Sequence, residues 1–147
     1  MISQKAKYAL RALSALARAP SGRTLTISDI ATGHRIPKKF LEQILLDLKH
    51  KGFVVSHRGK GGGYGLLRPA DRISYGEVLR AIDGPLAPLP CLSKTAYHHC
   101  PDCNGEEICE TRRVFARVAD ATRNVLDETT IADGLVAFPV SAKDGAS

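Results

Sequence analysis

The start of the chain carries apolar residues at helical spacing. Ala9, Leu13 and Leu16 fall on one face of a helix, and Ser3 is suited to cap its first turn. The alanines around them allow close packing against a neighbouring element. A proline and a glycine end the pattern shortly after Arg18. The pattern therefore predicts an amphipathic helix from Ser3 to about Arg18, with its apolar face against a core.

Two further helices are predicted close together. Thr26 and Asp29 form a capping box that opens the first, and Gly33 is expected to end it. The second begins near Pro37, because a first helical turn tolerates proline, and its apolar residues recur at helical spacing until Gly52. Two helices joined by a short turn predict a helix-turn-helix, whose second helix enters a groove of duplex DNA.

A hairpin is predicted directly after this second helix. Residues 53–55 and 64–67 have the composition of short strands, and the tip between them is almost entirely glycine and cation. A hairpin at this place is a wing, in which glycine lets the backbone approach a phosphate while Arg58 and Lys60 supply charge. A nucleotide-binding loop is disfavoured, because the glycines do not follow either common order and no helix start follows them.

The second half of the chain predicts two more helices and a turn. Ser74 and Glu77 form a capping box for a helix that stops at Gly84, after which several prolines keep the chain non-helical. From 108 to about 127, apolar residues repeat at alternating intervals of three and four, which predicts a long amphipathic helix. One more helical turn is expected at 131–135.

The apolar face of a long amphipathic helix near the end of a small domain must be buried against another element. A second copy of the chain would give a twofold dimer, and packing on the first helix of the same chain is the alternative. The predicted fold class is mainly α with a small β-wing: a winged helix-turn-helix plus a long C-terminal dimerisation helix. The expected divisions are a DNA-binding domain at 1–84, a cysteine-rich loop at 85–107, the dimerisation helix with a short following turn at 108–138, and a disordered tail at 139–147.

All four cysteines fall inside the loop and the start of the long helix. They are separated by eight, two and five residues, and two adjacent histidines lie among them. Thiolates bind soft or borderline metals, and a loop can wrap around a metal centre. Zinc sites usually pair two short knuckles, and only one Cys-x2-Cys is present, which favours an iron–sulfur cluster over zinc. A metal-free thiol sensor and a dithiol redox enzyme remain open as alternatives.

Composition and charge narrow the class of protein. The chain has 147 residues, 44% of them hydrophobic and 24% charged, which is typical of a globular domain. No apolar run approaches the roughly 18 residues that a membrane span needs. The first residues are too evenly basic for a signal peptide. We therefore expect a cytoplasmic protein without a membrane partner, in which clustered cysteines serve metal or redox chemistry.

The positive charge is concentrated in the first half. Residues 1–72 carry 14 lysines and arginines against four acidic residues, and residues 73–147 carry seven against 11, for a net charge of +6. A basic module joined to a mildly acidic one is typical of a nucleic-acid-binding domain attached to another unit. A solvated basic surface without a partner is the alternative.

Taken together, these motifs resemble the Rrf-two family of iron–sulfur winged-helix regulators, typified by IscR, NsrR and RirA. The resemblance covers roughly residues 1–135. It is carried by KYALRAL at 7–13, IPKKFLEQIL at 36–45, VSHRGKGGGY at 55–64, and the cysteine loop before a long helix. It implies a homodimeric transcription factor, not an enzyme, that binds a palindromic operator in double-stranded DNA. It also implies that a cluster controls operator affinity and lies near the DNA-binding domains.

The resemblance also implies a ligand set. Cys91, Cys103 and Cys109 match the family's three cluster cysteines, and the last two keep the family's five-residue gap. The positions that hold a fourth ligand in relatives are Arg112 and Lys7 in this chain. Neither side chain binds iron while it is charged, so the fourth ligand must come from elsewhere.

Another thiol is available for the fourth position. Cys100 is expected to supply it, with His98 or His99 as the fallback. The resemblance allows either a 2Fe–2S or a 4Fe–4S cluster, and zinc remains the less favoured metal. The cofactor prediction is thus an iron–sulfur cluster held by four cysteines of one loop.

The same resemblance implies contacts to DNA. Gln43 can pair with adenine, Glu42 can accept from the cytosine amino group, and Phe40 can contact a thymine methyl or pack beneath its helix. Arginine at the wing would enter the minor groove, where it reads groove width. The predicted DNA-binding residues are Ser3, Lys5, Lys38, Lys39, Phe40, Glu42, Gln43, Arg58, Lys60, Gly61 and Gly62.

Overall fold

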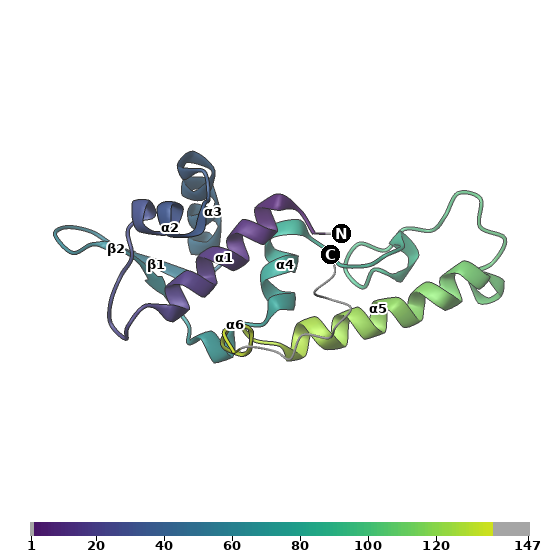
Figure 1. Ribbon diagram of the computed structural model, residues 1–147. Helices are drawn as coiled ribbons and strands as arrows, with labels where there is room; N and C mark the ends of the chain where they lie inside the picture. Colours follow the sequence, from purple (N-terminus) through teal and green to yellow (C-terminus); the bar gives the residue numbers. More distant parts are fainter. Residues whose placement is uncertain (1, 137–147) are drawn as a thin grey trace, which may run out of the picture.

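Helices dominate the computed structural model, which describes residues 2–136 (Figure 1). In chain order the elements are α1 (Gln4–Arg18), α2 (Ile27–His34), α3 (Lys38–His50), β1 (Val54–His57), β2 (Gly63–Leu66), η1 (Ala70–Arg72), α4 (Tyr75–Asp83), η2 (Pro90–Leu92), η3 (Glu106–Ile108), α5 (Glu110–Glu128) and α6 (Ile131–Gly134). No helix within the described residues has the length and apolar character to cross a bilayer. The tail predicted at 139–147 lies outside the described residues.

The helix-turn-helix is confirmed, with a shift of one residue at its turn. Thr26 and Asp29 form the predicted capping box at the start of α2. The helix continues through Gly33 to His34, and Arg35 closes it in a left-handed conformation with a φ of 54°. A non-glycine residue thus takes the conformation that usually favours glycine after a helix. The recognition helix α3 follows after the predicted proline.

The wing is a two-stranded antiparallel sheet attached to the segment before α2. Val54 of β1 lies opposite Leu66 of β2. Leu25 and Tyr64 form a further antiparallel bridge through backbone hydrogen bonds of 3.0 and 2.7 Å. Gly63 has a φ of +150°, and a Cβ atom there would lie 2.5 Å from the carbonyl oxygen of Leu25. Only glycine allows the two backbones to approach this closely.

The hydrophobic core joins the first three helices to the wing and to α4. Helix α1 contacts α2, α3, β2, α4 and α6, so its predicted apolar face is buried against most of the domain. The largest fully buried side chains are Leu13, Ile30, Leu41, Ile44, Leu45, Leu48, Val54, Ile73, Val78 and Ile131. The apolar residues of α3 are among them, which leaves its polar residues on the outside.

Helix α6 returns the chain to this core after α5. Ile131 is fully buried, and its N–H donates to the carbonyl of Ile73 at 2.8 Å. Tyr75 donates its N–H to the carbonyl of Thr129 at 2.9 Å. The predicted division assigns this turn to the dimerisation unit, whereas its packing attaches it to the DNA-binding domain. The C-terminal end of α5 is therefore anchored on that domain.

Helix α5 extends away from the winged helix, with the cysteine-rich segment beside its N-terminal half (Figure 1). It begins two residues later than predicted, because Ile108 lies in η3 and Cys109 caps the helix. Its main contacts within the chain are with α4 and η2, not with α1. The apolar side chains left exposed at its start and along its length are Ile108, Val114, Phe115, Val118 and Val125.

Candidate nucleic-acid interface and cysteine pocket

The recognition helix α3 presents polar side chains to solvent. Lys38, Lys39, Glu42 and Gln43 are all exposed at its N-terminal half. The apolar side chains on its other face are fully buried. A recognition helix contacts base edges mainly through its N-terminal residues. The exposed polar side chains of α3 therefore lie in the half of the helix that would face a major groove.

Gln43 is oriented by a carboxylate that the sequence reasoning missed. Its side-chain amide donates to Asp47 Oδ1 at 3.2 Å, and Lys5 Nζ lies 2.5 Å from Asp47 Oδ2. The hydrogen bond from Lys5 holds the pKa of Asp47 below its usual range, so this carboxylate is ionised at neutral pH. The Gln43 carbonyl oxygen has no partner among the described residues. Lys5 joins α1 to α3, and its contact with a DNA phosphate stays a prediction.

Phe40 packs partly against the domain. Its ring meets the ring of Tyr8 edge-on, with centroids 5.5 Å apart, and Arg11 lies over the Tyr8 ring at 5.6 Å. Both aromatic rings are half-buried against the core. Phe40 thus packs beneath its helix, as one of its two predicted roles requires, and its contact with a thymine methyl stays a prediction.

Ser3 connects the start of α1 to the end of α4. Its backbone N–H donates to Asp83 Oδ2 at 2.9 Å, and its hydroxyl donates to the other oxygen of the same carboxylate. The hydroxyl also accepts the N–H of Ala6. These contacts occupy the groups that were predicted to hold a DNA phosphate, and that contact stays a prediction.

The tip of the wing is exposed and cationic. Arg58, Lys60 and Gly61 are exposed, and neither cation takes part in an ion pair within residues 2–136. The Thr24 hydroxyl donates to the carbonyl of Gly61 at 2.8 Å and ties the tip to the body of the domain. A Cβ atom on Gly62 would lie 2.5 Å from the carbonyl oxygen of His57. Glycine therefore sets the shape of the tip, and both cations remain exposed; their contact with DNA phosphates stays a prediction.

The cysteine-rich segment folds back so that all four thiol-bearing residues line one cavity of about 410 Å³. Cys91 is buried, Cys103 and Cys109 are partly buried, and Cys100 is exposed. All four are free cysteines. The predicted fallback ligands, two histidines, do not line this cavity. The structure thus brings together the predicted set of Cys91, Cys100, Cys103 and Cys109.

Backbone N–H groups point at two of these sulfurs. Gly105 donates to Cys103 Sγ at 3.4 Å, and Arg112 donates to Cys109 Sγ at the same distance. The second contact lies at the N-terminus of α5, where the helix dipole also favours a thiolate. Both groups would stabilise negatively charged sulfur.

The four thiols fit the needs of an iron–sulfur cluster better than those of zinc. Within residues 2–136, no three histidine, cysteine, aspartate or glutamate side chains lie close enough together to hold a single metal ion. A zinc site needs its ligands about 2.0–2.3 Å from one ion, so these residues contain no preformed zinc site. An iron–sulfur cluster spreads its thiolate ligands over several iron atoms, and four thiols around one cavity fit its donor set.

Electrostatics around Cys100 favour the neutral thiol in the absence of a cation. Partial desolvation, the Asp102 carboxylate and the three other thiols raise the pKa of Cys100. A bound cation reverses such a shift, because it stabilises the thiolate directly.

Glu106 is the centre of a polar network beside the cavity that the sequence reasoning also missed. The Tyr97 hydroxyl donates to its carboxylate, His99 Nδ1 lies 3.3 Å away, and an Arg112 guanidinium nitrogen lies 3.8 Å away. These contacts, led by the bond from Tyr97, hold the pKa of Glu106 below its usual range. Arg112 also donates to the Cys91 carbonyl at 3.5 Å, and its buried Nε has no partner. A positive charge thus lies at the wall of the thiol-lined cavity.

The chain is similar to known transcriptional regulators. The family model described as Rrf2, iron-dependent transcriptional regulator, matches residues 2–136. The chain belongs to the Rrf2 family. It is similar to an rrf2-like HTH-type transcriptional regulator of Rhodobacter capsulatus, with 50% identity over 146 residues that cover 97% of each chain. The HTH-type transcriptional regulator CymR of Bacillus subtilis is 31% identical over 90% of this chain and 87% of its own.

Solved structures of this Rrf2 family share the fold. The structure of CymR, the global cysteine regulator of B. subtilis, matches with a TM-score of 0.77 and 30% identity, covering 92% of this chain and 95% of CymR. T. potens IscR matches with a TM-score of 0.70 and 27% identity, covering 92% and 85%. The prediction of a winged-helix regulator is confirmed, and the family and these relatives are transcriptional regulators rather than enzymes.

Proposed function

We propose that this Rrf2-family regulator binds palindromic duplex DNA as a homodimer and that an iron–sulfur cluster in the cysteine pocket controls its affinity for the operator. The observation that carries the proposal is the convergence of all four cysteines on one cavity, at the start of the helix with the largest uncovered apolar stripe. A change in the cavity would therefore act directly on the element expected to form the dimer.

The dimer is proposed because the apolar side chains of α5 are left uncovered within a single chain. Among its residues only Ala119 is buried, and four large apolar side chains are exposed. If α5 crossed the α5 helix of a second copy, the exposed apolar side chains of both helices would be buried together. Within one chain the cysteine segment lies at the opposite end from the wing (Figure 1). A cluster close to a DNA-binding domain would consequently face the domain of the partner.

DNA binding is assigned to α3 and the wing together. Exposed lysines at the start of α3 and cations at the wing tip would contact phosphates, while Glu42 and Gln43 would read bases in the major groove. Each phosphate contact contributes about −0.9 to the slope of log affinity against log salt. A steep linear fall is expected, and a flat response would contradict the assignment.

The cluster would be held by the four cysteines, with two backbone N–H groups and the Arg112 guanidinium compensating its negative charge. When bound, such a cluster supplies redox and ligand-exchange chemistry to the regulator. The chain's own contribution is to tie the 91–109 loop to the first turn of α5. Loss of this connection between the loop and α5 would change the angle between the two wings of the dimer. Operator affinity would then fall, because tight binding requires both wings to contact their half-sites at the same time.

The direct test is the composition of protein purified without oxygen. We expect a brown protein containing iron and acid-labile sulfide, and a colourless Cys103→Ala variant. A matched Ser93→Ala variant, in the same loop but outside the cysteine cavity, should keep the colour. A colourless wild type with stoichiometric zinc would contradict the cluster.

A second candidate is a cluster-free thiol sensor. It is favoured because no three potential ligands within residues 2–136 lie close enough together to hold one metal ion. It is also favoured by the likeness to B. subtilis CymR, described as a global cysteine regulator, and to the oxidised form of Staphylococcus aureus CymR. Unchanged operator binding and unchanged response to the signal in a variant lacking all four cysteines would exclude both the cluster and the thiol sensor. Reversible loss of binding on thiol oxidation of metal-free protein would favour this candidate.

A further inference from the structure

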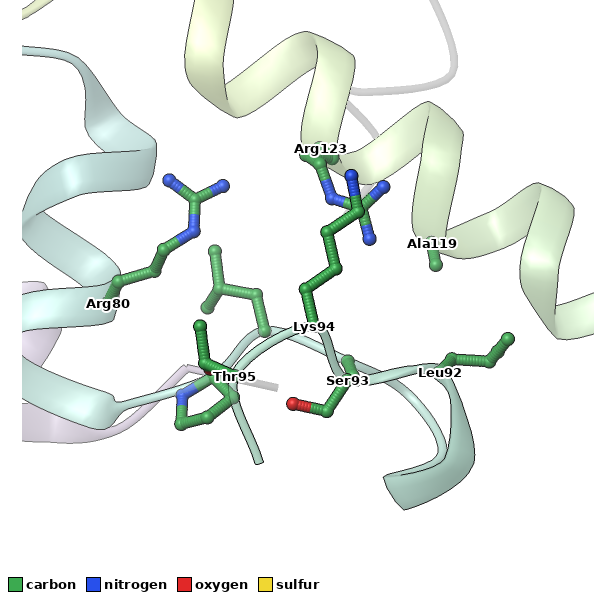
Figure 2. Close-up of a pocket in the computed structure, with 10 residues that line it drawn as sticks. Arg80, Leu92, Ser93, Lys94, Thr95, Ala119 and Arg123 are labelled. Atoms are coloured by element: carbon green, nitrogen blue, oxygen red, sulfur yellow. The ribbon is translucent and has the colours of Figure 1, made fainter. Parts of the chain in front are cut away.

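A second cavity, of about 190 Å³, lies where α4, the loop after Gly84 and α5 meet (Figure 2). It shares no lining residue with the cysteine pocket. At about 30 Å³ for each water molecule, it has room for roughly six waters or one small metabolite.

Three cations from three separate segments line this cavity. Arg80 comes from α4, Lys94 from the loop and Arg123 from α5, and Figure 2 shows their side chains around the same space. Arg80 pairs with Asp127 at 2.7 Å, and Arg123 pairs with Asp120 at 3.2 Å.

These pairs offset the charges of Arg80 and Arg123, so Lys94 supplies the unpaired positive charge of the cavity lining in the described part of the chain. Neither aspartate lines it, and no acidic residue does among the described residues. Lys94 has no ion pair or hydrogen-bond partner within residues 2–136. An anion bound beside Lys94 would meet one unpaired positive charge and the remaining N–H donors of two guanidinium groups.

The rest of the lining suits an organic molecule rather than a bare ion. Leu86, Leu92 and Ala119 provide apolar surface. The Ser93 Oγ accepts the N–H of Ala96 at 2.9 Å, which leaves its O–H free to donate to a ligand. Small-molecule sites commonly combine such apolar walls with a few polar groups that fix orientation.

We infer that this cavity is an effector site for a small organic carboxylate, whose carboxylate group lies between Arg80, Lys94 and Arg123 and whose apolar part lies on Leu86 and Leu92. Binding would fasten the loop directly after Cys91 to both α4 and α5. The inference goes beyond the proposed function, since it requires neither a metal nor DNA. It gives the regulator a second input, acting on the same loop as the cysteines.

The test uses the full-length protein, without DNA, and two probes. Sodium butyrate supplies a carboxylate with an apolar body, and inorganic phosphate supplies charge alone. Butylamine and sodium chloride at equal ionic strength are the controls. We expect butyrate to raise the unfolding temperature saturably, as a ligand specific to the folded state must. Amide hydrogen exchange should slow in residues 86–95 and stay unchanged in the wing.

Two variants with the same charge change localise the effect. Lys94→Gln should weaken butyrate binding at least tenfold, while Lys49→Gln, on the exposed end of α3, should leave it unchanged. Both lysines are exposed, so both variants should fold. The inference is overturned if butyrate does no more than chloride, if Lys94→Gln responds like the wild type, or if phosphate binds and butyrate does not. Failure of cluster binding or DNA binding would not affect any of these outcomes.

Discussion

The attachment of the wing to the body of the domain depends on one glycine. In a Gly63→Ala variant, the new Cβ atom would lie 2.5 Å from the carbonyl oxygen and 2.7 Å from the carbonyl carbon of Leu25. Both neighbours are backbone atoms that form the bridge to Tyr64, so they cannot move without lengthening its hydrogen bonds. The φ of +150° adds strain for any residue with a side chain.

The expected loss of stability in Gly63→Ala follows from the steric clash and the backbone strain. Forcing an atom into a packed position costs about 1–3 kcal/mol, and a glycine-only backbone conformation costs a further ~1–3 kcal/mol. Because part of the wing can relax, we expect the free energy of unfolding to fall by about 2–4 kcal/mol. For a chain of this size, that corresponds to a fall of roughly 5–15 °C in the unfolding temperature.

A neighbouring glycine in the same strand provides the matched control. Gly65 has no atom within 4 Å of the position of a Cβ and does not have a positive φ. Gly65→Ala should be neutral or stabilising by up to about 1 kcal/mol, since alanine loses less backbone entropy in a strand.

The assay is urea unfolding of both variants, followed by amide hydrogen exchange at Leu25 and Tyr64. Only Gly63→Ala should be destabilised and should exchange faster at this bridge. It should also bind DNA more weakly at a temperature where it remains folded. Equal stability of the two variants would refute the reasoning that a close backbone approach fixes the wing.

Three further predictions concern reading of DNA, the dimer and acid stability. Gln43→Ala should reduce discrimination at one base pair by about 1–3 kcal/mol, measured on duplexes that each differ by a single base pair; equal weakening on all duplexes would reject base reading. Val118→Glu should yield monomers in sedimentation experiments, whereas Asn124→Glu on the same helix should not, and a persistent dimer would reject α5 as its interface. The N–H of Ser74 and the Arg68 guanidinium lower the pKa of Glu77, so its contribution to stability is present above about pH 4.5 and is lost as the pH falls through the lowered pKa. Glu77→Gln should therefore lose less stability between pH 7 and 3 in urea unfolding than the wild type, and an equal loss would contradict the assignment.

Local chemistry made most of the fold predictable. The caps at Ser3, Thr26 and Ser74 are recognisable because each side chain bonds to a backbone N–H within three residues. The wing is recognisable because the tip between its two strands, residues 58–62, consists only of glycine, arginine and lysine. By contrast, Gly33 does not end α2, because Arg35 adopts the left-handed conformation and the helix extends to it. Helix propensity alone does not decide such an end.

The parts of the site that escaped prediction depend on contacts between distant segments. Asp47 binds Lys5 across the domain, and Asp83 binds Ser3 although 80 residues separate them. Glu106 lies in the expected loop, but its role beside Arg112 follows from how that loop folds back on α5. No spacing rule in one sequence encodes these pairings. The four cysteines were predictable as a group because they are close in sequence.

The central claim is that the state of the cysteine pocket sets the affinity of the winged helix for DNA. Its most direct measurement is the operator affinity of one anaerobic preparation, before and after removal of iron, at fixed salt. A coupling of about 1–3 kcal/mol predicts a change of roughly 5- to 150-fold, absent in Cys103→Ala. The same affinity with and without iron, in protein shown to have carried the cluster, would contradict the account.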